Sequence, residues 1–349
     1  MGMVDYYPAI NRPAKPTCSV CVANYNGVAL LESCLDSILG QSCEIAYEII
    51  VHDDASSDDS VALLQSKYPQ VSIICSEENV GFCVSNNRMV EYARGDHVLL
   101  LNNDAALYPD ALTTLFGEAN ELRKAAILSL PQYDWESASL VDRGCLLDPF
   151  YNPVPNLDPL RTDVAMVIGA CLYLPRTFWL EMGGFPEWIE SIGEDMYLCC
   201  MARLRGASVT VAARSGYRHQ QGSSFGGNRV VAGQLQTNFR RRRLSERNKT
   251  SVLFICTPTI AVWPLLAMHL GSLVAEGFSL SILKRDIRIW ELIYLPALKH
   301  VFHSWHQLMG ERRRAQSLRT AALKDYAAGF VPLPQKLRLL FRHGLPKVE

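Results

Sequence analysis

Residues 17–101 alternate short apolar runs with helical patterns, and few folds accommodate such an alternation. The apolar runs at 17–24, 47–51, 71–75 and 97–101 have the length of buried strands. Apolar residues at helical spacing fill the intervals at 30–39, 60–67 and about 84–93. Strands and helices that alternate at this short spacing form βα units around a parallel sheet. The sequence therefore predicts an α/β fold.

The chain beyond residue 101 continues with less regular segments. A helix is expected to start near Pro109, and residues 131–161, rich in Pro, Asp and aromatic residues, are expected to form a long loop-bearing insertion. A strand over 165–174, an amphipathic helix from Glu194 to Leu204 and a strand over 208–212 are predicted to follow.

Polar clusters follow the strands of the predicted sheet, at the point where each strand ends. They are Asn24 to Gly27, Asp53 to Asp59, and Asn102 to Asp104. In open α/β sheets, ligands bind beyond the carboxyl ends of the strands. The sequence therefore predicts a binding site at this edge.

Carboxylates in these clusters suit two roles. Asp53 and Asp54 follow a buried strand directly, so they could accept hydrogen bonds from a pyrimidine N–H or a ribose hydroxyl; the alternative is that they only shape the turn and cap the next helix. Asp104 follows an apolar strand and could supply a hard oxygen ligand for Mg²⁺ or Mn²⁺ bound to a diphosphate. A plain turn before Pro109 is the alternative for Asp104.

Two later positions carry further candidates. Glu194 and Asp195 lie in the first turn of a predicted helix, where the helix dipole alone explains acids, but apolar cover from Trp188 or Met196 would give one of them the basicity of a general base. His219, at a strand end, could ligate a metal or contact phosphate, or could be structural.

Charge divides the chain unevenly. Residues 240–349 hold 19 Lys and Arg against 7 Asp and Glu, whereas residues 1–239 hold 15 against 28. The apolar stretch 252–275 and the mixed basic and apolar stretch 283–308 favour helices that lie in the headgroup region of a membrane. A membrane span over 252–275, a helical appendage in water and a solvated basic surface remain alternatives.

Cysteine usage and the N-terminus indicate a reducing compartment. The 11 cysteines mostly lie in apolar runs, where they behave as small hydrophobic residues. Cys18 and Cys21 have CxxC spacing, but on a strand their side chains point to opposite faces, so zinc or redox chemistry is not expected. Residues 1–16 lack the layout of a signal peptide, which predicts a cytoplasmic protein.

A set of short motifs in residues 17–250 resembles those of family 2 inverting glycosyltransferases with the GT-A fold. The resemblance extends to the bacterial rhamnosyltransferase-like branch, which builds cell-surface polysaccharide. The motifs are Ala23-Asn24-Tyr25-Asn26-Gly27, Asp53-Asp54-Ala55-Ser56, Asn79-Val80-Gly81-Phe82 with Asn86-Asn87, Leu101-Asn102-Asn103-Asp104, Gly169-Ala170, Gly183-Gly184-Phe185 and Gly193-Glu194-Asp195. This resemblance implies a Rossmann-like, mostly parallel central sheet with flanking helices.

The resemblance also implies roles for individual residues. Asp195 matches the catalytic base, with Glu194 as its neighbour, and Asp104 and His219 match metal ligands for Mg²⁺ or Mn²⁺. Residues implied in donor binding are Ala23, Asn24, Tyr25, Asp53, Asp54, Gly81, Asn87, Asn102, Asn103 and Asp104. Residues implied in acceptor binding are Gly169, Ala170 and Trp188. Asn102 and Asn103 replace acids of the family's DxD-type motif, which weakens the expected metal site.

The predicted organisation is an N-terminal extension (1–16), a GT-A catalytic domain (17–250) and a helical membrane-associated region (251–349). The basic segment at 240–249 resembles the one that links the family's catalytic domain to membrane-associated helices, and the segment at 312–314 resembles the later basic element of the tail. The expected activity is inverting transfer from a dTDP- or UDP-linked sugar, dTDP-rhamnose first, to a lipid-linked or polysaccharide acceptor at the cytoplasmic face of the bacterial inner membrane.

Two other classes of function compete with this one. A sugar-nucleotide nucleotidyltransferase shares this kind of sheet, but it would open with a Gly-rich, basic loop where this chain has Asn24 to Gly27. A non-catalytic protein that binds membrane or nucleic acid is motivated by Arg240 to Arg243, but the acidic first part of the chain disfavours a polyanion. No nucleic-acid partner is therefore expected.

Overall fold

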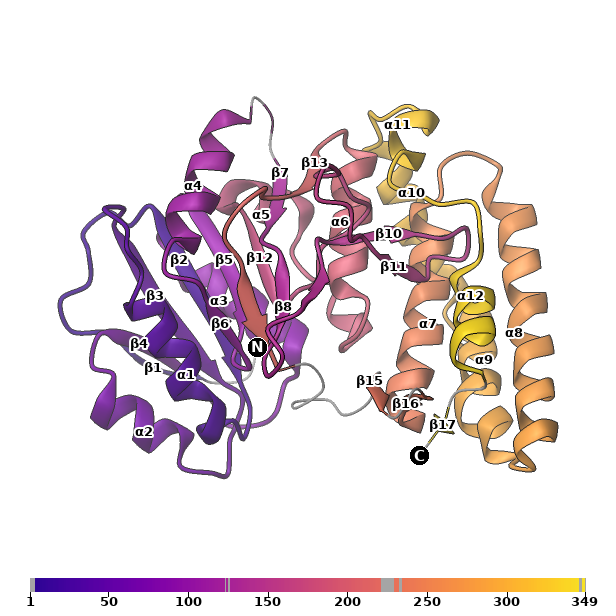
Figure 1. Cartoon of the computed structure of the whole chain (residues 1–349), viewed down its shortest axis with the longest axis horizontal. Helices are drawn as coiled ribbons and strands as arrows, with labels where there is room; N and C mark the ends of the chain where they lie inside the picture. Colours follow the sequence, from indigo (N-terminus) through magenta and orange to yellow (C-terminus); the bar gives the residue numbers. More distant parts are fainter. Residues whose placement is uncertain are drawn as a thin grey trace.

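The computed structural model describes residues 4–122, 124, 126–220, 229–231, 234–344 and 347–348. An eight-stranded sheet, in the order β1-β4-β3-β2-β5-β12-β7-β13, forms the core of the first part of the chain, and helices cover both of its faces (Figure 1). Its strands are β1 (Val4–Tyr7), β2 (Cys18–Asn24), β3 (Tyr47–Asp53), β4 (Val71–Ser76), β5 (His97–Asn102), β7 (Ala126–Ser129), β12 (Cys171–Pro175) and β13 (Ser208–Val211).

The four strands predicted from residues 17–101 are present and parallel. β4, β3, β2 and β5 pair in that order, whereas β12 runs antiparallel between β5 and β7. The predicted strand over 165–174 was wrong in extent, because pairing in the sheet begins only at Cys171. Ala165 to Val167 are apolar because they are buried, and the amides of Ala165 and Met166 both donate to the carbonyl of Cys145.

The predicted N-terminal extension contributes to the sheet. β1 pairs antiparallel with β4 along the edge, with Val4 opposite Ser76 and Tyr7 opposite Ile73. Residues 1–16 therefore include one strand of the main fold.

Helices form a layer on each face of the sheet. α1 (Val28–Leu39), α2 (Ser60–Lys67) and α4 (Ala111–Glu121) pack on one face, and α3 (Phe82–Tyr92), α5 (Arg176–Met182) and α6 (Glu194–Leu204) pack on the other. Cys18 is buried in the first layer and Cys21 in the second. The prediction that these two cysteines point to opposite faces is therefore confirmed.

Short strands complete the fold, and four of them, β8 to β11, lie where a loop-bearing insertion was predicted. β6 (Ala105–Leu107), β14 (Tyr217–His219), β8 (Gln132–Asp134) and β9 (Leu140–Asp142) form a four-stranded sheet. β10 (Cys145–Leu147) pairs with β11 (Pro153–Pro155), and β15 (Arg229–Val231), β16 (Gln234–Thr237) and β17 (Lys347–Val348) form a further small sheet.

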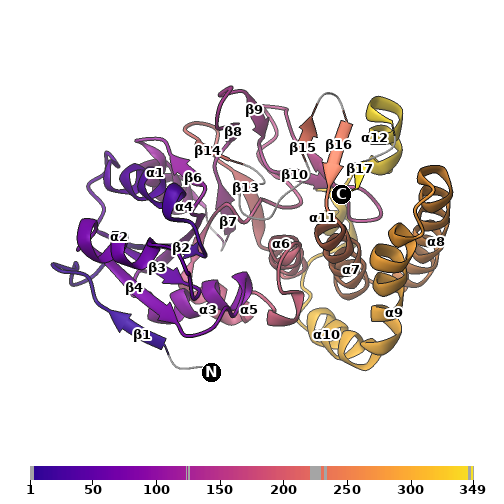
Figure 2. The same ribbon diagram turned by 90° about the horizontal axis from the view of Figure 1, so that it is seen from below.

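Helices make up most of the remaining chain. They are α7 (Phe239–Cys256), α8 (Val262–Lys284), the π-helix η2 (Trp290–Tyr294), α9 (Leu295–His303), α10 (Trp305–Ser317), α11 (Leu323–Ala327) and α12 (Gln335–His343). Figure 2 shows α7 between α6 and α8. Because α7 covers its outer side, α6 is buried at all but one of its eleven positions, so the predicted amphipathic pattern was wrong.

The apolar stretch predicted over 252–275 is divided between two helices. Residues 252–256 are the last turn of α7, and all five are buried in the same core as α6. After a break at Pro258, α8 is the one helix within the described residues that is long and apolar enough to cross a membrane. The predicted boundary at residue 250 therefore falls inside α7, and the first part of the predicted membrane segment packs against protein.

Candidate active site

The turns that end β2, β3 and β5 are joined by side-chain hydrogen bonds. Asn24 Nδ2 donates to Asp53 Oδ2 (3.0 Å), and Asn103 Nδ2 donates to Asn24 Oδ1 (2.8 Å). Gly27 must lack a side chain because a Cβ there would lie 2.3 Å from the amide of Asn103. Asn24, Asp53 and Asn103 thus lie together, as predicted, but all three are buried and hold one another.

Tyr25 is the exposed member of the first turn. Its side chain is 53% exposed, next to Ala23 and Asn24 at the end of β2. The following residue, Asn26, accepts hydrogen bonds from the amide and hydroxyl of Ser57, which ties the first turn to the second. An exposed ring on a fixed turn can stack on a flat ligand at this edge.

Asp54 holds a loop that leads into α3. Its two carboxylate oxygens accept hydrogen bonds from the backbone N–H groups of Val80 (2.7 Å) and Gly81 (2.8 Å). Burial raises the pKa of Asp54, and these two N–H groups act against that increase. Asp54 therefore places the start of α3 beside the site. Each of its carboxylate oxygens already accepts one hydrogen bond, so only the second lone pair of each oxygen can bind a ligand.

Asn87 of α3 joins this helix to the loop before the second acidic cluster. Its amide exchanges two hydrogen bonds with the backbone of Phe185, each 2.9 Å long. Gly184 leaves the room for this contact, since a Cβ there would lie 2.5 Å from Asn87 Oδ1. Asn87 therefore lies in the framework of the site, and the ring contact between Phe82 and Phe185 joins the same two segments.

Asp104 and His219 form a pair at the edge. Strand pairing between β6 and β14 sets His219 opposite Ala105, and His219 Nε2 lies 3.1 Å from Asp104 Oδ1. Both residues are buried. The carboxylate and the imidazole predicted as metal ligands are therefore in direct contact, although they come from distant parts of the sequence.

Gln132 supports His219 from β8, and sequence reasoning missed it. Gln132 Oε1 accepts hydrogen bonds from Tyr217 Oη (2.7 Å) and His219 Nδ1 (3.3 Å). The tautomer of His219 that donates a hydrogen bond from Nδ1 to Gln132 would present a lone pair at Nε2. A lone pair that faces a carboxylate oxygen needs a proton or a cation near both atoms.

This donor set fits a divalent cation bound together with phosphate. For bonds of about 2.1 Å, adjacent ligands of an octahedron lie about 3.0 Å apart, close to the separation of 3.1 Å between Asp104 Oδ1 and His219 Nε2. No group of three His, Cys, Asp or Glu side chains in the described part of the chain could hold a metal alone. Ligand oxygens would have to supply the other positions.

Asp195 and Glu194 form the first turn of α6. Asp195 Oδ2 accepts a hydrogen bond from the N–H of Gly169 (3.0 Å), and Asp195 Oδ1 accepts one from Met196 (2.6 Å). Burial raises the pKa of both acids, while Arg241 on α7 acts in the opposite direction. The pair therefore has more basicity than exposed carboxylates, which is what a general base at neutral pH requires.

The segment 168–170 connects the acid pair to the pair Asp104 and His219. The amide of Gly169 binds Asp195, and the carbonyl of Ala170 accepts a hydrogen bond from the amide of Asn102 (3.1 Å), two residues before Asp104. Trp188 lies on η1 (Glu187–Ile189), with its ring edge-on to Tyr197 of α6. Gly169, Ala170 and Trp188, predicted to bind acceptor, thus lie around Asp195 and at the start of α6.

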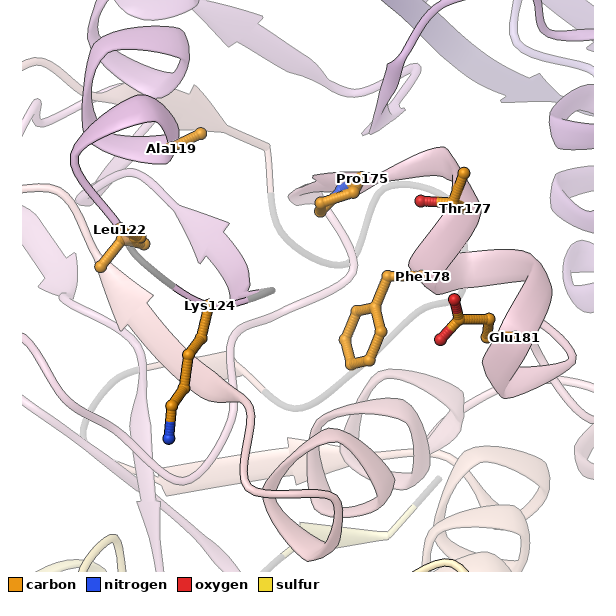
Figure 3. Close-up of a pocket in the computed structure, with 7 residues that line it drawn as sticks. All are labelled: Ala119, Leu122, Lys124, Pro175, Thr177, Phe178 and Glu181. Carbon is orange, nitrogen blue, oxygen red and sulfur yellow. The ribbon is translucent and has the colours of Figure 1, made fainter.

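An open pocket of about 320 Å³ lies elsewhere, between the end of α4 and α5 (Figure 3). Its lining includes Leu122, Lys124, Phe178 and Glu181, and none of the predicted site residues. Pro175 pairs with His97 at the start of β5, whereas Asp104 follows the end of β5. The pocket therefore lies at the amino ends of the parallel strands, away from the acids. We assign it no part in the site.

The order of the strands in the sheet and the helices on both of its faces are those of the GT-A fold. Residues 19–176 match the family model for glycosyl transferase family 2. This segment is therefore similar to family 2 glycosyltransferases, and the chain has the GT-A fold.

Curated relatives are similar to parts of the chain. Over 105 residues it is 40% identical to an uncharacterized protein of Mycobacterium tuberculosis, a match that covers 30% of this chain and 33% of that protein. It is 30% identical over 188 residues to chondroitin synthase of Escherichia coli, covering 52% of this chain and 26% of the synthase. A poly(ribitol-phosphate) beta-glucosyltransferase of Bacillus spizizenii is 25% identical over 205 residues, covering 57% and 31%. The chain spans about a third of the length of the first relatives it matches.

Solved structures with the same fold are distant in sequence. S. aureus TarS in complex with UDP is 16% identical, with a TM-score of 0.54 over 90% of this chain and 83% of that chain. The mannosyltransferase PcManGT of Pyrobaculum calidifontis, in complex with GDP-Man and Mn²⁺, is 15% identical, with a TM-score of 0.51 over 88% of each chain.

Proposed function

We propose that this protein is an inverting glycosyltransferase that moves one sugar from a nucleoside diphosphate donor to an acceptor hydroxyl. The observation that carries the proposal is the position of Asp195, whose carboxylate is bound to the segment 168–170 that also contacts the strand leading to Asp104. Such a transfer requires a base for the acceptor hydroxyl and a site for the donor diphosphate, and both are proposed at the carboxyl ends of the parallel strands.

The mechanism is one displacement. Asp195 takes the proton of the acceptor hydroxyl, and the acceptor oxygen forms a bond to the anomeric carbon as the bond to the diphosphate oxygen breaks. A divalent cation held by Asp104 and His219 would offset the charge on the leaving diphosphate. A single displacement inverts the configuration at the anomeric carbon.

The donor side is assigned to the turns of β2, β3 and β5. Tyr25 offers a ring for the nucleobase, and Asp53 and Asp54 border the same turn, each with its carboxylate oxygens engaged once by backbone or amide groups. We propose dTDP-rhamnose as the first donor to test and UDP-linked sugars as the second. The acceptor is proposed to be a lipid-linked or growing polysaccharide of the cell surface.

A panel of nucleotide sugars tests this proposal. Thermal shift of the purified protein is measured with each nucleotide sugar, with and without Mn²⁺, and transfer is then followed with the donor that stabilises most. We expect one nucleotide class to raise the Tm in a Mn²⁺-dependent way. The absence of a shift with every donor would contradict the proposal. Release of pyrophosphate from a nucleoside triphosphate would also contradict it and would favour a nucleotidyltransferase.

We further propose that α8 attaches the protein to the cytoplasmic face of the bacterial inner membrane without spanning it. One side of α8 is exposed and apolar, with Trp263, Phe278 and Ile282 exposed by 46, 48 and 73%. The other side carries His269, bound to Thr250, and Glu276, paired with Arg242 and Lys336. A helix so bound to protein on one side suits a position in the headgroup region.

Charge near the end of α8 supports the same proposal. Lys284, Arg285 and Arg288 are exposed where the apolar side ends. Basic side chains next to an apolar surface favour anionic lipid. The basic segment at 240–249, which resembles a link between the catalytic domain and membrane-associated helices, contributes less: Lys249 is buried against Glu246, and Arg247 pairs with Glu190.

Flotation with vesicles tests the attachment. The variant Trp263→Ser/Phe278→Ser/Ile282→Ser should lose most of its binding to vesicles that contain phosphatidylglycerol. Ile10→Ser is the control for loss of an exposed apolar side chain. Ile10 is 64% exposed but lies beside the start of β4, where its amide donates to the carbonyl of Pro69. Equal binding of the two variants, or extraction only by detergent, would contradict a peripheral attachment through α8.

A further inference from the structure

The segment that leads into the catalytic pair has a strained backbone. Glu190, Ile192 and Gly193 have φ angles of 66, 68 and 102°, and the next two residues are Glu194 and Asp195. The left-handed region is unfavourable for side chains other than Gly, and most of all for β-branched ones such as Ile192. Contacts elsewhere in the protein must therefore hold this segment in place.

Asn248 of α7 supplies these contacts. Its side chain is fully buried, and Nδ2 lies 2.9, 2.9 and 2.8 Å from the carbonyl oxygens of Ile189, Ser191 and Ile192. An amide group has two N–H donors, so one of them is shared between two carbonyls. One side chain thus binds almost the whole turn before α6.

Arg247 fixes the orientation of Asn248 and binds the same turn. Arg247 Nε donates to Asn248 Oδ1 (2.9 Å), so the amide cannot be flipped. The guanidinium also donates to the carbonyl of Ile189 (2.9 Å) and to the carboxylate of Glu190 (2.7 Å). Together, the two residues satisfy carbonyls that a strained, half-buried turn leaves without helical partners.

A residue nearer the start of α7 acts on the acid pair itself. Arg241 lies seven residues before Asn248, a spacing that places both on one side of α7, and its charge acts on Glu194 and Asp195. α7 therefore faces the acids and the turn before them along two of its turns.

We propose that Asn248 and Arg247 are positioning residues that hold the turn 189–193 and thereby fix the carboxylate of Asp195 against Gly169. The proposal rests on the proposed function, in which Asp195 is the base. Neither residue contacts the reacting atoms. Their effect on transfer comes through the place and orientation of α6, since a displacement of about 1 Å can lower a rate about 100-fold.

Kinetics of the full-length protein test the first part. Asn248→Ala should lower kcat about 10- to 100-fold while the Kd of the donor changes less than about twofold. Asn248→Asp, which sets a carboxylate against three carbonyls, should lower kcat further. Arg243→Ala is the control, because Arg243 is exposed on the same helix. In an Asp195→Asn background, Asn248→Ala should cause no further loss, because there is no base left to position.

Hydrogen exchange tests the turn independently of activity. In Asn248→Ala, the amides of 189–196 should exchange faster while those of the α7 interior keep their protection. Unchanged exchange at 189–196, or a kcat equal to that of Arg243→Ala, would overturn the proposal. If Asn248→Ala does not fold, Arg247→Ala gives the same readouts with a partly exposed residue. If wild-type protein transfers no sugar, the proposed function fails, and hydrogen exchange alone still decides the positioning role.

Discussion

Glu194 and Asp195 are two adjacent acids in a buried position, and their protonation should govern both rate and stability. Burial raises the pKa of each, and the second acid raises that of Glu194 further. Backbone N–H groups at the start of α6 favour the charged form but do not cancel this effect. The folded protein therefore keeps a proton on the pair at pH values where the unfolded chain has lost it.

This difference predicts a stability that falls with rising pH. A group with a raised pKa in the folded state contributes stability below its unfolded pKa, and this contribution disappears as the pH rises through the folded pKa. Urea midpoints of the wild type and of Glu194→Gln are compared between pH 5 and pH 8, and the wild type should lose stability relative to Glu194→Gln as the pH rises. Parallel curves for the two proteins would contradict the assignment. The transfer rate should show the opposite slope and rise with pH, because Asp195 acts in its charged form.

Asp195→Asn should remove transfer and spare donor binding. The amide keeps the shape of the side chain but cannot accept the proton, so kcat should fall by about 100- to 10,000-fold. Donor affinity, measured by calorimetry, should stay within about twofold. Asp158→Asn, in the loop after β11, is a surface control. Wild-type turnover in Asp195→Asn would remove the base from the mechanism.

Gln132→Ala should weaken the metal site without touching a ligand. Gln132 fixes the tautomer of His219 through Nδ1, and loss of such a partner lowers metal affinity about 10- to 100-fold. Mn²⁺ titration in the presence of the nucleoside diphosphate measures this affinity. Gln65→Ala, at an exposed position of α2, should leave it unchanged. An equal Mn²⁺ affinity in both variants would mean that Gln132 serves only Tyr217.

The difference between Gln132 and His219 shows what the sequence could reveal about single residues. His219 and Asp104 were predicted as ligands from their strand ends and from the family resemblance. Gln132 had no such signal, because it lies at the start of a segment predicted as an insertion. Its role depends on the parallel pairing of β8 with β14, a contact between distant segments that local patterns do not encode.

Among the helices and strands, the end of α7 is held by α10. Arg312 donates hydrogen bonds to the carbonyls of Phe254, Thr257 and Thr259, at 2.6, 2.8 and 2.9 Å. The last carbonyls of a helix have no partners within it, so these bonds satisfy groups at the end of α7 and in the break before α8. The basic element at 312–314, predicted for a membrane-associated tail, thus includes a helix cap.

Arg312→Ala should therefore destabilise the fold by about 1.5–3 kcal/mol, the range for hydrogen bonds to charged groups. The neighbouring Arg313 is exposed, and Arg313→Ala should change stability by no more than about 0.5 kcal/mol. Urea denaturation of both variants measures the difference. If the two variants have the same midpoint, Arg312 adds nothing to the end of α7.

Across the whole molecule, the sheet was predictable and the packing of the C-terminal helices was not. Each βα unit of residues 17–101 carries its own periodicity, and the polar turns mark where the strands end. The last turn of α7 (residues 252–256) and α8 are both apolar, yet the first enters the core and the second keeps an exposed side. Hydropathy measures composition along a segment, whereas this difference depends on which surface reaches α6.

Paired substitutions on the two helices separate these environments. Ile255, on α7, is fully buried, whereas Ile282, on α8, is 73% exposed. Ile255→Asp places a charge among Val252, Phe254 and α6 without a partner, so we expect a loss of more than about 4 kcal/mol, close to the whole stability of many domains. Ile282→Asp should change the Tm little and should instead weaken binding to anionic vesicles. A different outcome is that Ile255→Asp stays soluble and unfolds cooperatively but no longer binds the membrane. Residues 252–256 would then face lipid, which would contradict their place in the core between α6 and the C-terminal helices.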